Sequence, residues 1–243
     1  AESQNEILER QQAYLDRFED ASFEEILNDT ELYAFAMAGG ASAFKDNCAT
    51  CHGSGEAGLP GGYPNLIDDD WLWGGRLSEI HYTIQHGIRV EGSYDTRLSD
   101  MPAFGKDKLL NREEIDAVVD YVLAMSGQKA KGHEAQGGEI FKMQCASCHG
   151  PDGKGLREFG APNLTDKIWL YGGDRRSIYH SVYYSHAGMM PAWGGRLDDN
   201  TIRQLTIYLH QLGGGEEEPA DNVSEEPEGP EQFTGSEQPA SSE

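Results

Sequence analysis

The chain has 243 residues, a formal net charge of −23, 37% hydrophobic residues and 30 glycines. This length allows one large domain or two small ones, and the apolar content is low for a globular protein. The sequence has no apolar run long enough to span a membrane, and no basic segment followed by an apolar one that would indicate a secretory signal. Acidic residues gather at the ends: residues 216–243 carry ten and no basic residue, and residues 1–30 carry nine against two basic ones. A nucleic-acid-binding protein is disfavoured, because neutralising phosphates requires a basic surface.

Residues 1–30 are predicted to be a helical linker. Apolar residues recur near the helical period over residues 5–28, at Ile7, Tyr14, Leu15 and Phe18. A second helix start is predicted at Ser22, because Glu25 follows three residues later and completes a capping box.

The first predicted domain covers residues 31–128. Its opening helix places Gly40, Phe44 and Cys48 at steps of four residues, so that they share one face. The features that follow are, in chain order, Cys48-Ala49-Thr50-Cys51-His52, Pro64-Asn65-Leu66, Trp71-Leu72-Trp73-Gly74-Gly75, Met101-Pro102 and an amphipathic helix at 115–121.

The same order recurs in residues 132–214, with an offset of 97 residues between the cysteine motifs. A lysine- and small-residue stretch at 127–132 is the predicted linker. The second set of features is Gly137, Phe141, Cys145-Ala146-Ser147-Cys148-His149, Pro162-Asn163-Leu164, Trp169-Leu170-Tyr171-Gly172-Gly173, Met190-Pro191 and a helix at 202–208. We therefore predict an all-α protein made of two tandem domains.

Both cysteine motifs have the form C-x-x-C-H, the signature of covalent attachment of a c-type haem. Two thiols at this spacing can add to the two vinyl groups of one porphyrin, and the adjacent histidine then lies under the iron. Two haems also supply apolar bulk that small, glycine-rich domains lack. Zinc binding, thioredoxin-like dithiols and disulfides are less favoured, since each pair carries an adjacent histidine and no β-rich pattern surrounds it. The predicted attachment residues are Cys48, Cys51, Cys145 and Cys148, and the predicted iron ligands are His52 and His149.

A methionine thioether is predicted as the sixth ligand of each iron. Met101 and Met190 both begin a Met-Pro-Ala-aromatic-Gly sequence. The proline disfavours helix at the methionine, which leaves it on an extended loop that can reach over a porphyrin. His86 and His186 lie just before these loops and are the competing ligands. A bis-histidine haem stays open for the first domain, whose loop is longer.

The repeat also predicts residues around the haem ligands. A ligating histidine normally donates its other ring N–H to a carbonyl or carboxylate, and the carbonyls of Pro64 and Pro162 are the candidates. The indole N–H groups of the two Trp-rich loops, together with Arg76 or Arg175, could bind haem propionates or could serve ordinary packing.

Residues 215–243 are rich in Glu, Pro, Ser and Gly and contain one aromatic residue. This composition predicts a disordered acidic tail. Solvation is its favoured role, and docking of basic partners is the alternative.

Each unit resembles a class I cytochrome c domain, in which the first and last helices cross through a glycine and aromatic residues. Gly40, Phe44 and Tyr121 match that crossing in the first unit, and Gly137, Phe141 and Tyr208 match it in the second. Residues 5–214 as a whole resemble the periplasmic part of the dihaem subunit of cbb3-type cytochrome c oxidases. The segments that carry this resemblance are 63–75, 161–172, 188–197 and 208–215.

The resemblance implies Cys48, Cys51, His52 and Met101 around one haem, and Cys145, Cys148, His149 and Met190 around the other. It implies electron transfer without catalysis by the chain itself. Electrons from a donor cytochrome c or a quinol-oxidising complex would cross both haems toward the other subunits and the oxygen-reducing site. The alternatives are a free periplasmic dihaem shuttle and a dihaem peroxidase, the latter disfavoured by the two Met-Pro loops.

Members of this family have an N-terminal membrane anchor, which the present sequence lacks. We expect the chain to be the soluble portion of such a subunit at the periplasmic face of the bacterial inner membrane, with an anchorless relative as the alternative. The compartment agrees with the chemistry, because c-type haems are attached outside the cytoplasm.

Overall fold

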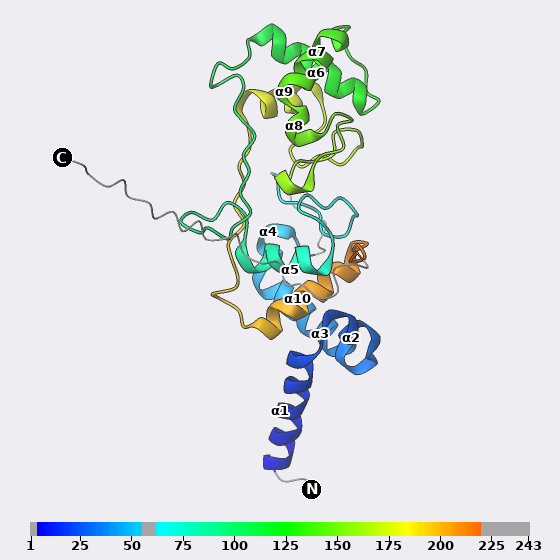
Figure 1. The fold of residues 1–243 in the computed structure, drawn as a ribbon, viewed down its shortest axis with the longest axis vertical. Coiled ribbons are helices and arrows are strands. Elements are labelled where there is room, and N and C mark those ends of the chain that lie inside the picture. Colours follow the sequence, from blue (N-terminus) through cyan, green and yellow to red (C-terminus); the bar gives the residue numbers. More distant parts are fainter. Residues whose placement is uncertain (1–3, 55–61, 220–243) are drawn as a thin grey trace, which may run out of the picture.

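The computed structural model describes residues 4–54 and 62–219 (Figure 1). Within these residues the secondary structure is helical, with isolated β-bridges and no strand, which confirms the all-α prediction. The elements are α1 (Gln4–Asp20), α2 (Phe23–Asn28), α3 (Thr30–Asn47), α4 (Ala49–His52), α5 (Leu77–His86), α6 (Arg112–Met125), α7 (Glu134–Gln144), α8 (Ala146–His149), the 3-10 turn η1 (Arg157–Phe159), α9 (Arg175–Tyr184) and α10 (Asp199–Leu212).

The helices form two lobes (Figure 1). The first lobe consists of α3, α4, α5 and α10 and carries the first cysteine motif, and the second lobe consists of α6 to α9 and carries the second motif. The principal helix pairs are α3 with α10 and α6 with α7, and α5 and α9 pack on α10 and α6 respectively. Two separate hydrophobic clusters form the cores of the two lobes.

The last helix of the described residues, α10, packs on α3. Gly40 lies so close to α10 that a Cβ atom there would overlap the Gln204 carbonyl oxygen. The rings of Phe44 and Tyr208 lie 6.0 Å apart between centroids. The predicted crossing of Gly40 and Phe44 with Tyr121 is therefore wrong, because the second sequence repeat supplies the partner helix.

The reciprocal pair, α6 with α7, joins helices that are neighbours in sequence. A Cβ atom at Gly137 would overlap the Ala117 carbonyl oxygen. The rings of Tyr121 and Phe141 lie 5.2 Å apart between centroids. The predicted crossing of Gly137 and Phe141 with Tyr208 is therefore also wrong.

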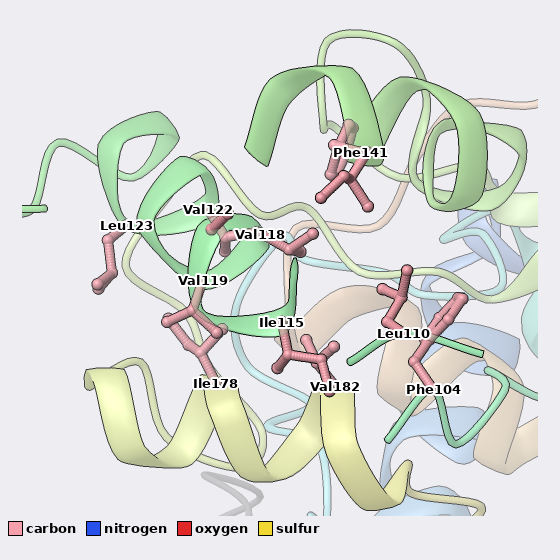
Figure 2. Close-up of a cluster of buried hydrophobic side chains, with 12 residues drawn as sticks. Phe104, Leu110, Ile115, Val118, Val119, Val122, Leu123, Phe141, Ile178 and Val182 are labelled. Carbon is pink, nitrogen blue, oxygen red and sulfur yellow. The ribbon is translucent and has the colours of Figure 1, made fainter. Parts of the chain in front are cut away.

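As a result of this exchange, the second lobe is one continuous stretch of chain inserted into the first. Figure 2 shows its core, in which Ile115 and Val119 of α6 face Ile178 and Val182 of α9. Phe104, which precedes α6, belongs to the same cluster. The linker predicted at 127–132 thus lies inside the second lobe, between α6 and α7, and does not separate the two lobes.

Two extended segments, around 87–100 and 185–193, connect the lobes and run side by side (Figure 1). The Ile88 N–H donates to the Met190 carbonyl at 2.9 Å, and the Met190 N–H donates to the Ile88 carbonyl at 3.0 Å. Arg89 donates to the Gly188 carbonyl at 3.0 Å. Gly87, which ends α5, has φ +68°, and a Cβ atom there would lie 2.5 Å from the Met190 carbonyl oxygen. A glycine is needed here both for the left-handed backbone and for the close approach of the returning chain.

A buried carboxylate joins α6 to α9 and to the start of α7. Asp120 is fully buried and accepts hydrogen bonds from Arg175, from the His133 ring at 2.9 Å, and from the backbone N–H groups of Lys131 and His133 at 3.1 and 3.2 Å. Arg175 also pairs with Asp116 at 3.0 Å. Burial alone would raise the pKa of Asp120, but the hydrogen bonds from Arg175 and His133 outweigh it and lower this pKa to about 2.

The N-terminal helices pack against the first lobe. The predicted helix start at Ser22 is confirmed: its Oγ accepts from the Glu25 N–H at 3.2 Å, and the Glu25 carboxylate accepts from the Ser22 N–H at 2.7 Å. A separate cluster holds this region to α3, α5 and α10, and its buried members are Phe18, Ile26, Leu32, Ala36, Leu77 and Ile207. Residues 1–3 of the predicted linker lie outside the described residues.

The beginning of the predicted acidic tail is part of the fold, which corrects the prediction of disorder from residue 215. The Glu216 N–H donates to the Gly75 carbonyl at 2.9 Å, and its carboxylate accepts from the Gly75 N–H at 3.2 Å and pairs with Arg157. Glu218 accepts from the Ser78 N–H at 2.8 Å. These contacts tie 216–218 to the first lobe and to η1 of the second. Residues 220–243 lie outside the described residues.

Candidate haem-binding sites

The first cysteine motif lies where α3 ends and the single turn α4 begins. Cys48 terminates α3, with its N–H donating to the Phe44 carbonyl at 2.8 Å, and the His52 N–H donates to the Cys48 carbonyl at 3.0 Å. This turn presents Cys51 and His52 directly after Cys48. At the end of α7 the second motif repeats the same two hydrogen bonds at 2.8 and 3.0 Å, through Phe141, Cys145 and His149.

Each motif histidine contacts the proline carbonyl predicted for it. The Nδ1 atom of His52 lies 3.2 Å from the Pro64 oxygen, and that of His149 lies 3.2 Å from the Pro162 oxygen. A carbonyl can only accept, so Nδ1 carries the proton and Nε2 keeps its lone pair. Burial lowers the pKa of both histidines, and the hydrogen bond to the proline carbonyl opposes this only in part. Each imidazole is therefore held in one orientation in its neutral form, with the Nε2 lone pair available.

None of the four motif cysteines is joined to another in a disulfide. Burial raises the pKa of Cys48 and of Cys145 to about 11, with a smaller effect from the neighbouring Cys51 or Cys148. Among residues 4–54 and 62–219, no group of three or more His, Cys, Asp or Glu side chains could hold a metal ion. The thiols thus lie at the apolar border of each core, next to one histidine each.

The two loop methionines lie in the lobes opposite to those expected from their order in the sequence. Met190 packs on the core cluster of the first lobe, where Cys48 also packs. Met101 packs on the core cluster of the second lobe, as does Cys145. This placement differs from the expected grouping of Met101 with the first motif and of Met190 with the second, because the chain crosses between the lobes before each methionine.

The competing histidines pack against tyrosine rings. The ring of His86 lies 4.3 Å from that of Tyr82, and His186 stacks on Tyr171 at 3.7 Å between centroids with planes only 2° apart. His186 Nε2 also lies 3.1 Å from the Ser181 Oγ. These contacts favour the methionines over the histidines as the sixth ligands.

Among the predicted propionate-binding groups, Trp71 has a buried donor that is unused. Its Nε1 atom is buried and has no hydrogen-bond partner among the described residues. Arg175 is engaged by the carboxylates of Asp116 and Asp120, and Arg76 lies 3.8 Å from Glu79. The structure therefore assigns the arginines to ion pairs within the protein, whereas the Trp71 N–H is free to donate to a bound group.

Sequence reasoning missed a reciprocal contact between the lobes. A Cβ atom at Gly160 would overlap the ring of Trp73, and one at Gly62 would overlap the ring of Tyr171. Trp73 and Tyr171 occupy the same place in the repeat, as do the two glycines. Each lobe thus presses one aromatic ring onto the other lobe's loop before its Pro-Asn-Leu segment. The aromatic residue at the same position of both repeats could have indicated this contact. The repeat alone does not indicate which lobe each ring packs against.

Acidic residues also meet at this junction. The pKa of Asp70 is raised to about 6, first by burial and then by the nearby carboxylates of Asp166, Asp68 and Asp69, while Arg157 acts in the opposite direction. The folded protein therefore holds the Asp70 proton more tightly than the unfolded chain does, and this residue's contribution to stability declines as pH rises from about 4 to 6.

Replacing Asp70 with asparagine is expected to raise the melting temperature at about pH 7, because the amide removes a charge that the junction disfavours. Below about pH 4 the wild-type carboxyl is protonated and the two proteins should melt together. Thermal unfolding of Asp70→Asn at both pH values measures this, with the exposed Asp107→Asn as control. An equal gain at both pH values would show that the Asp70 charge is not the cause.

The two sequence repeats match a known protein family. The model of "Cytochrome C oxidase, cbb3-type, subunit III" matches residues 35–122 and 132–209, the two sequence repeats. The chain belongs to this family. This confirms that the repeats are cytochrome c domains in sequence, while in space each lobe combines α helices from both.

Two similar proteins support this family assignment. The chain is 52% identical over 192 residues to the cbb3-type cytochrome c oxidase subunit CcoP of Cereibacter sphaeroides. The aligned region covers 79% of this chain and 66% of that relative. It is 52% identical over 197 residues to subunit FixP of Bradyrhizobium diazoefficiens, covering 80% and 67%. The chain thus spans about two thirds of these relatives. No helix in the described part of the chain is long and apolar enough to cross a membrane.

Proposed function

We propose that the chain carries two haems c, one on each cysteine motif, and passes electrons through them within a cbb3-type oxidase. The observation that carries this proposal is the duplicated site. In both lobes the histidine of a C-x-x-C-H turn contacts a proline carbonyl, and the first cysteine of that turn packs on the same apolar cluster as a loop methionine. Family membership supports the same assignment.

The residues present fit a haem. Each motif histidine keeps its Nε2 lone pair for iron, because Nδ1 donates to Pro64 or Pro162. The buried Nε1 of Trp71 lacks a partner and suits a propionate oxygen. The apolar clusters beside Cys48 and Cys145 supply the surroundings that a porphyrin face requires.

A bound haem supplies an iron that alternates between two oxidation states. The protein's task is to hold the ligands unchanged in both states. The proline carbonyls fix the histidine rings, and the methionines are held by loops that are hydrogen-bonded to the opposite segment. The buried cores exclude water and keep the local dielectric low, so that little rearranges when the charge changes. No acid, base or nucleophile is required, and the chain is not a catalyst by itself.

The junction between the lobes supports transfer between the two sites. Trp73 and Tyr171 lie across it in opposite directions, against Gly160 and Gly62. Trp71 and Trp169, which lie two residues before these rings, pack on the same core clusters as Cys48 and Cys145 respectively. The reciprocal contact holds the two loops together and thereby keeps the two sites at a fixed separation.

We place the chain at the periplasmic face of the bacterial inner membrane. There it receives electrons from a donor cytochrome c or a quinol-oxidising complex and passes them to the other oxidase subunits. Family membership favours this role over that of a free shuttle. Encounters with a soluble donor are expected to be weak and sensitive to salt, as is typical of redox complexes.

The test uses the complete subunit assembled in the oxidase. Removing either motif, by Cys48→Ser with Cys51→Ser or by Cys145→Ser with Cys148→Ser, is expected to reduce oxygen uptake from reduced cytochrome c to near background, because the electron path then lacks one site. Met143→Ala serves as control, since Met143 is 71% exposed and belongs to neither core cluster. Unchanged oxygen uptake in the double-serine variants would contradict the proposed path.

A further inference from the structure

Directly after α10 the chain turns back onto the first lobe. A Cβ atom at Gly213 would lie 2.5 Å from the Leu66 carbonyl oxygen. The His210 Nε2 atom lies 3.0 Å from the Glu216 carbonyl oxygen, and because a carbonyl can only accept, the imidazole donates this hydrogen bond. Glu216 therefore has a fixed place beside the first lobe, although it lies beyond α10.

Glu216 binds the first lobe through its backbone and its side chain. Its N–H donates to the Gly75 carbonyl at 2.9 Å, and its carboxylate accepts from the Gly75 N–H at 3.2 Å. A Cβ atom at Gly75 would overlap the ring of Trp71, and Trp71 packs on the same core cluster as Cys48. Glu216 thus holds the loop that connects its own contact to the surroundings of the first cysteine motif.

The same carboxylate pairs with Arg157, the first residue of η1 in the second lobe. This turn follows the second cysteine motif closely, because the Leu156 N–H donates to the Cys148 carbonyl at 3.0 Å. At the other end of η1, a Cβ atom at Gly160 would overlap the ring of Trp73 from the first lobe. The turn is therefore held to the first lobe at both ends, by an ion pair and by an aromatic contact.

Electrostatics favour the ion pair. The hydrogen bond to Glu216 raises the pKa of Arg157, as do the charges of Glu79 and Asp70, while burial lowers it. Burial alone would raise the pKa of Glu216, but the hydrogen bonds from Arg157 and Gly75 outweigh it and lower this pKa. Both groups are therefore charged near pH 7. Their side chains are 46% and 27% exposed, so added salt is expected to weaken the pair.

We propose that Glu216 is a positioning residue for electron transfer between the two haem sites, because one carboxylate holds the Gly75 loop of the first lobe and Arg157 of the second. The inference rests on the proposed function, in which each cysteine motif carries a haem. With both contacts made, η1 cannot tilt against the first lobe, and the separation of the two sites stays constant. Without the ion pair, the Trp73 contact remains as a pivot and the lobes adopt a range of separations, which slows electron transfer because its rate falls steeply with distance.

The first test measures the alignment of the lobes in the full chain with both haems attached. A nitroxide label on Glu113→Cys, an exposed position of α6, reports by pulsed electron paramagnetic resonance its distances to the two oxidised irons. The distance within the second lobe is an internal reference, and the distance to the first lobe reports the alignment. We expect Glu216→Gln and Arg157→Gln to broaden only the distance distribution between the lobes. Glu217→Gln is the matched control, because Glu217 is exposed and the change removes the same charge from the same segment.

The second test measures oxygen uptake from reduced cytochrome c by the assembled oxidase. Glu216→Gln and Arg157→Gln should each slow it several-fold at unchanged haem content, and the double variant should be no slower than the slower single variant, because the two residues act as one pair. Unchanged distance distributions, equal broadening with Glu217→Gln, or broadening without slower oxygen uptake would overturn the inference. A chain that takes up no haem would instead contradict the proposed function, so the haem content separates the two failures.

Discussion

Replacing Gly137 with alanine is expected to destabilise the second lobe by about 1–3 kcal/mol or more, since the added methyl group overpacks a tight helix contact. The Cβ atom would overlap the Ala117 carbonyl oxygen, which is backbone, and would lie 2.9 Å from the Tyr121 Cβ. Because neither group can rotate away, α6 and α7 must separate. Guanidinium-induced unfolding followed by circular dichroism measures the loss as a lower midpoint.

The neighbouring glycine on the same helix provides the control. A Cβ atom at Gly138 would lie 3.1 Å from the ring of Tyr121, which can shift slightly. Alanine is favoured over glycine within a helix by up to about 1 kcal/mol, so Gly138→Ala should be near neutral. If Gly137→Ala and Gly138→Ala had the same stability, the close contact of α7 with α6 would be contradicted.

Replacing Asp120 with alanine is expected to cost about 3 kcal/mol or more, the range for removing one partner of a buried ion pair. The change leaves Arg175 with only Asp116, and the Lys131 and His133 N–H groups lose their acceptor. Urea unfolding measures the free-energy difference. Asp116→Ala is the matched control, because Asp116 pairs with the same arginine but its side chain is 49% exposed. An equally small loss in both variants would contradict the role given to Asp120.

The ionisation of Asp120 is also expected to make the stability of the fold depend on pH. The pKa of Asp120 is lowered to about 2 in the folded protein, below its ordinary value of 3.8. The stability that its charge contributes is therefore complete above about pH 4 and is lost as pH falls toward 2. Asp120→Asn should lack this part of the acid dependence, which unfolding at a series of pH values would show.

The local geometry of the candidate haem-binding motifs could be predicted from the sequence because the proposed chemistry fixes their spacing. The two cysteines and the histidine lie within one helical turn, and the carbonyls of Pro64 and Pro162 follow from the repeat. The capping box at Ser22 was equally readable, because it depends on residues three apart. Local geometry determines all of these features.

The exchange of helices between the repeats could not be read from the same pattern. The α3–α10 and α6–α7 contacts use the same residue types, a glycine and a phenylalanine against a tyrosine. The duplicated sequence therefore permits either pairing. The lengths of the connections carried the remaining signal. The α6–α7 connection, 126–133, is short and favours packing of neighbours, whereas 87–111 between α5 and α6 is long enough to cross to another lobe.

Part of the C-terminal segment was mispredicted for a different reason. Its composition is typical of disorder, yet the Glu216 carboxylate accepts a hydrogen bond from the Gly75 N–H and pairs with the Arg157 guanidinium. Both partners lie far from Glu216 in the sequence. Composition reports what a segment can bury by itself and does not include such distant partners.

The most direct test of the central claim is the intact mass of the chain after maturation with the complete c-type haem attachment machinery, measured under denaturing conditions together with the absorption spectrum of the oxidised native protein. The account predicts a mass increase equal to two haems and a sulfur-to-iron charge-transfer band of two-haem intensity. Colourless protein, or protein that carries only a metal ion on its cysteines, would contradict it.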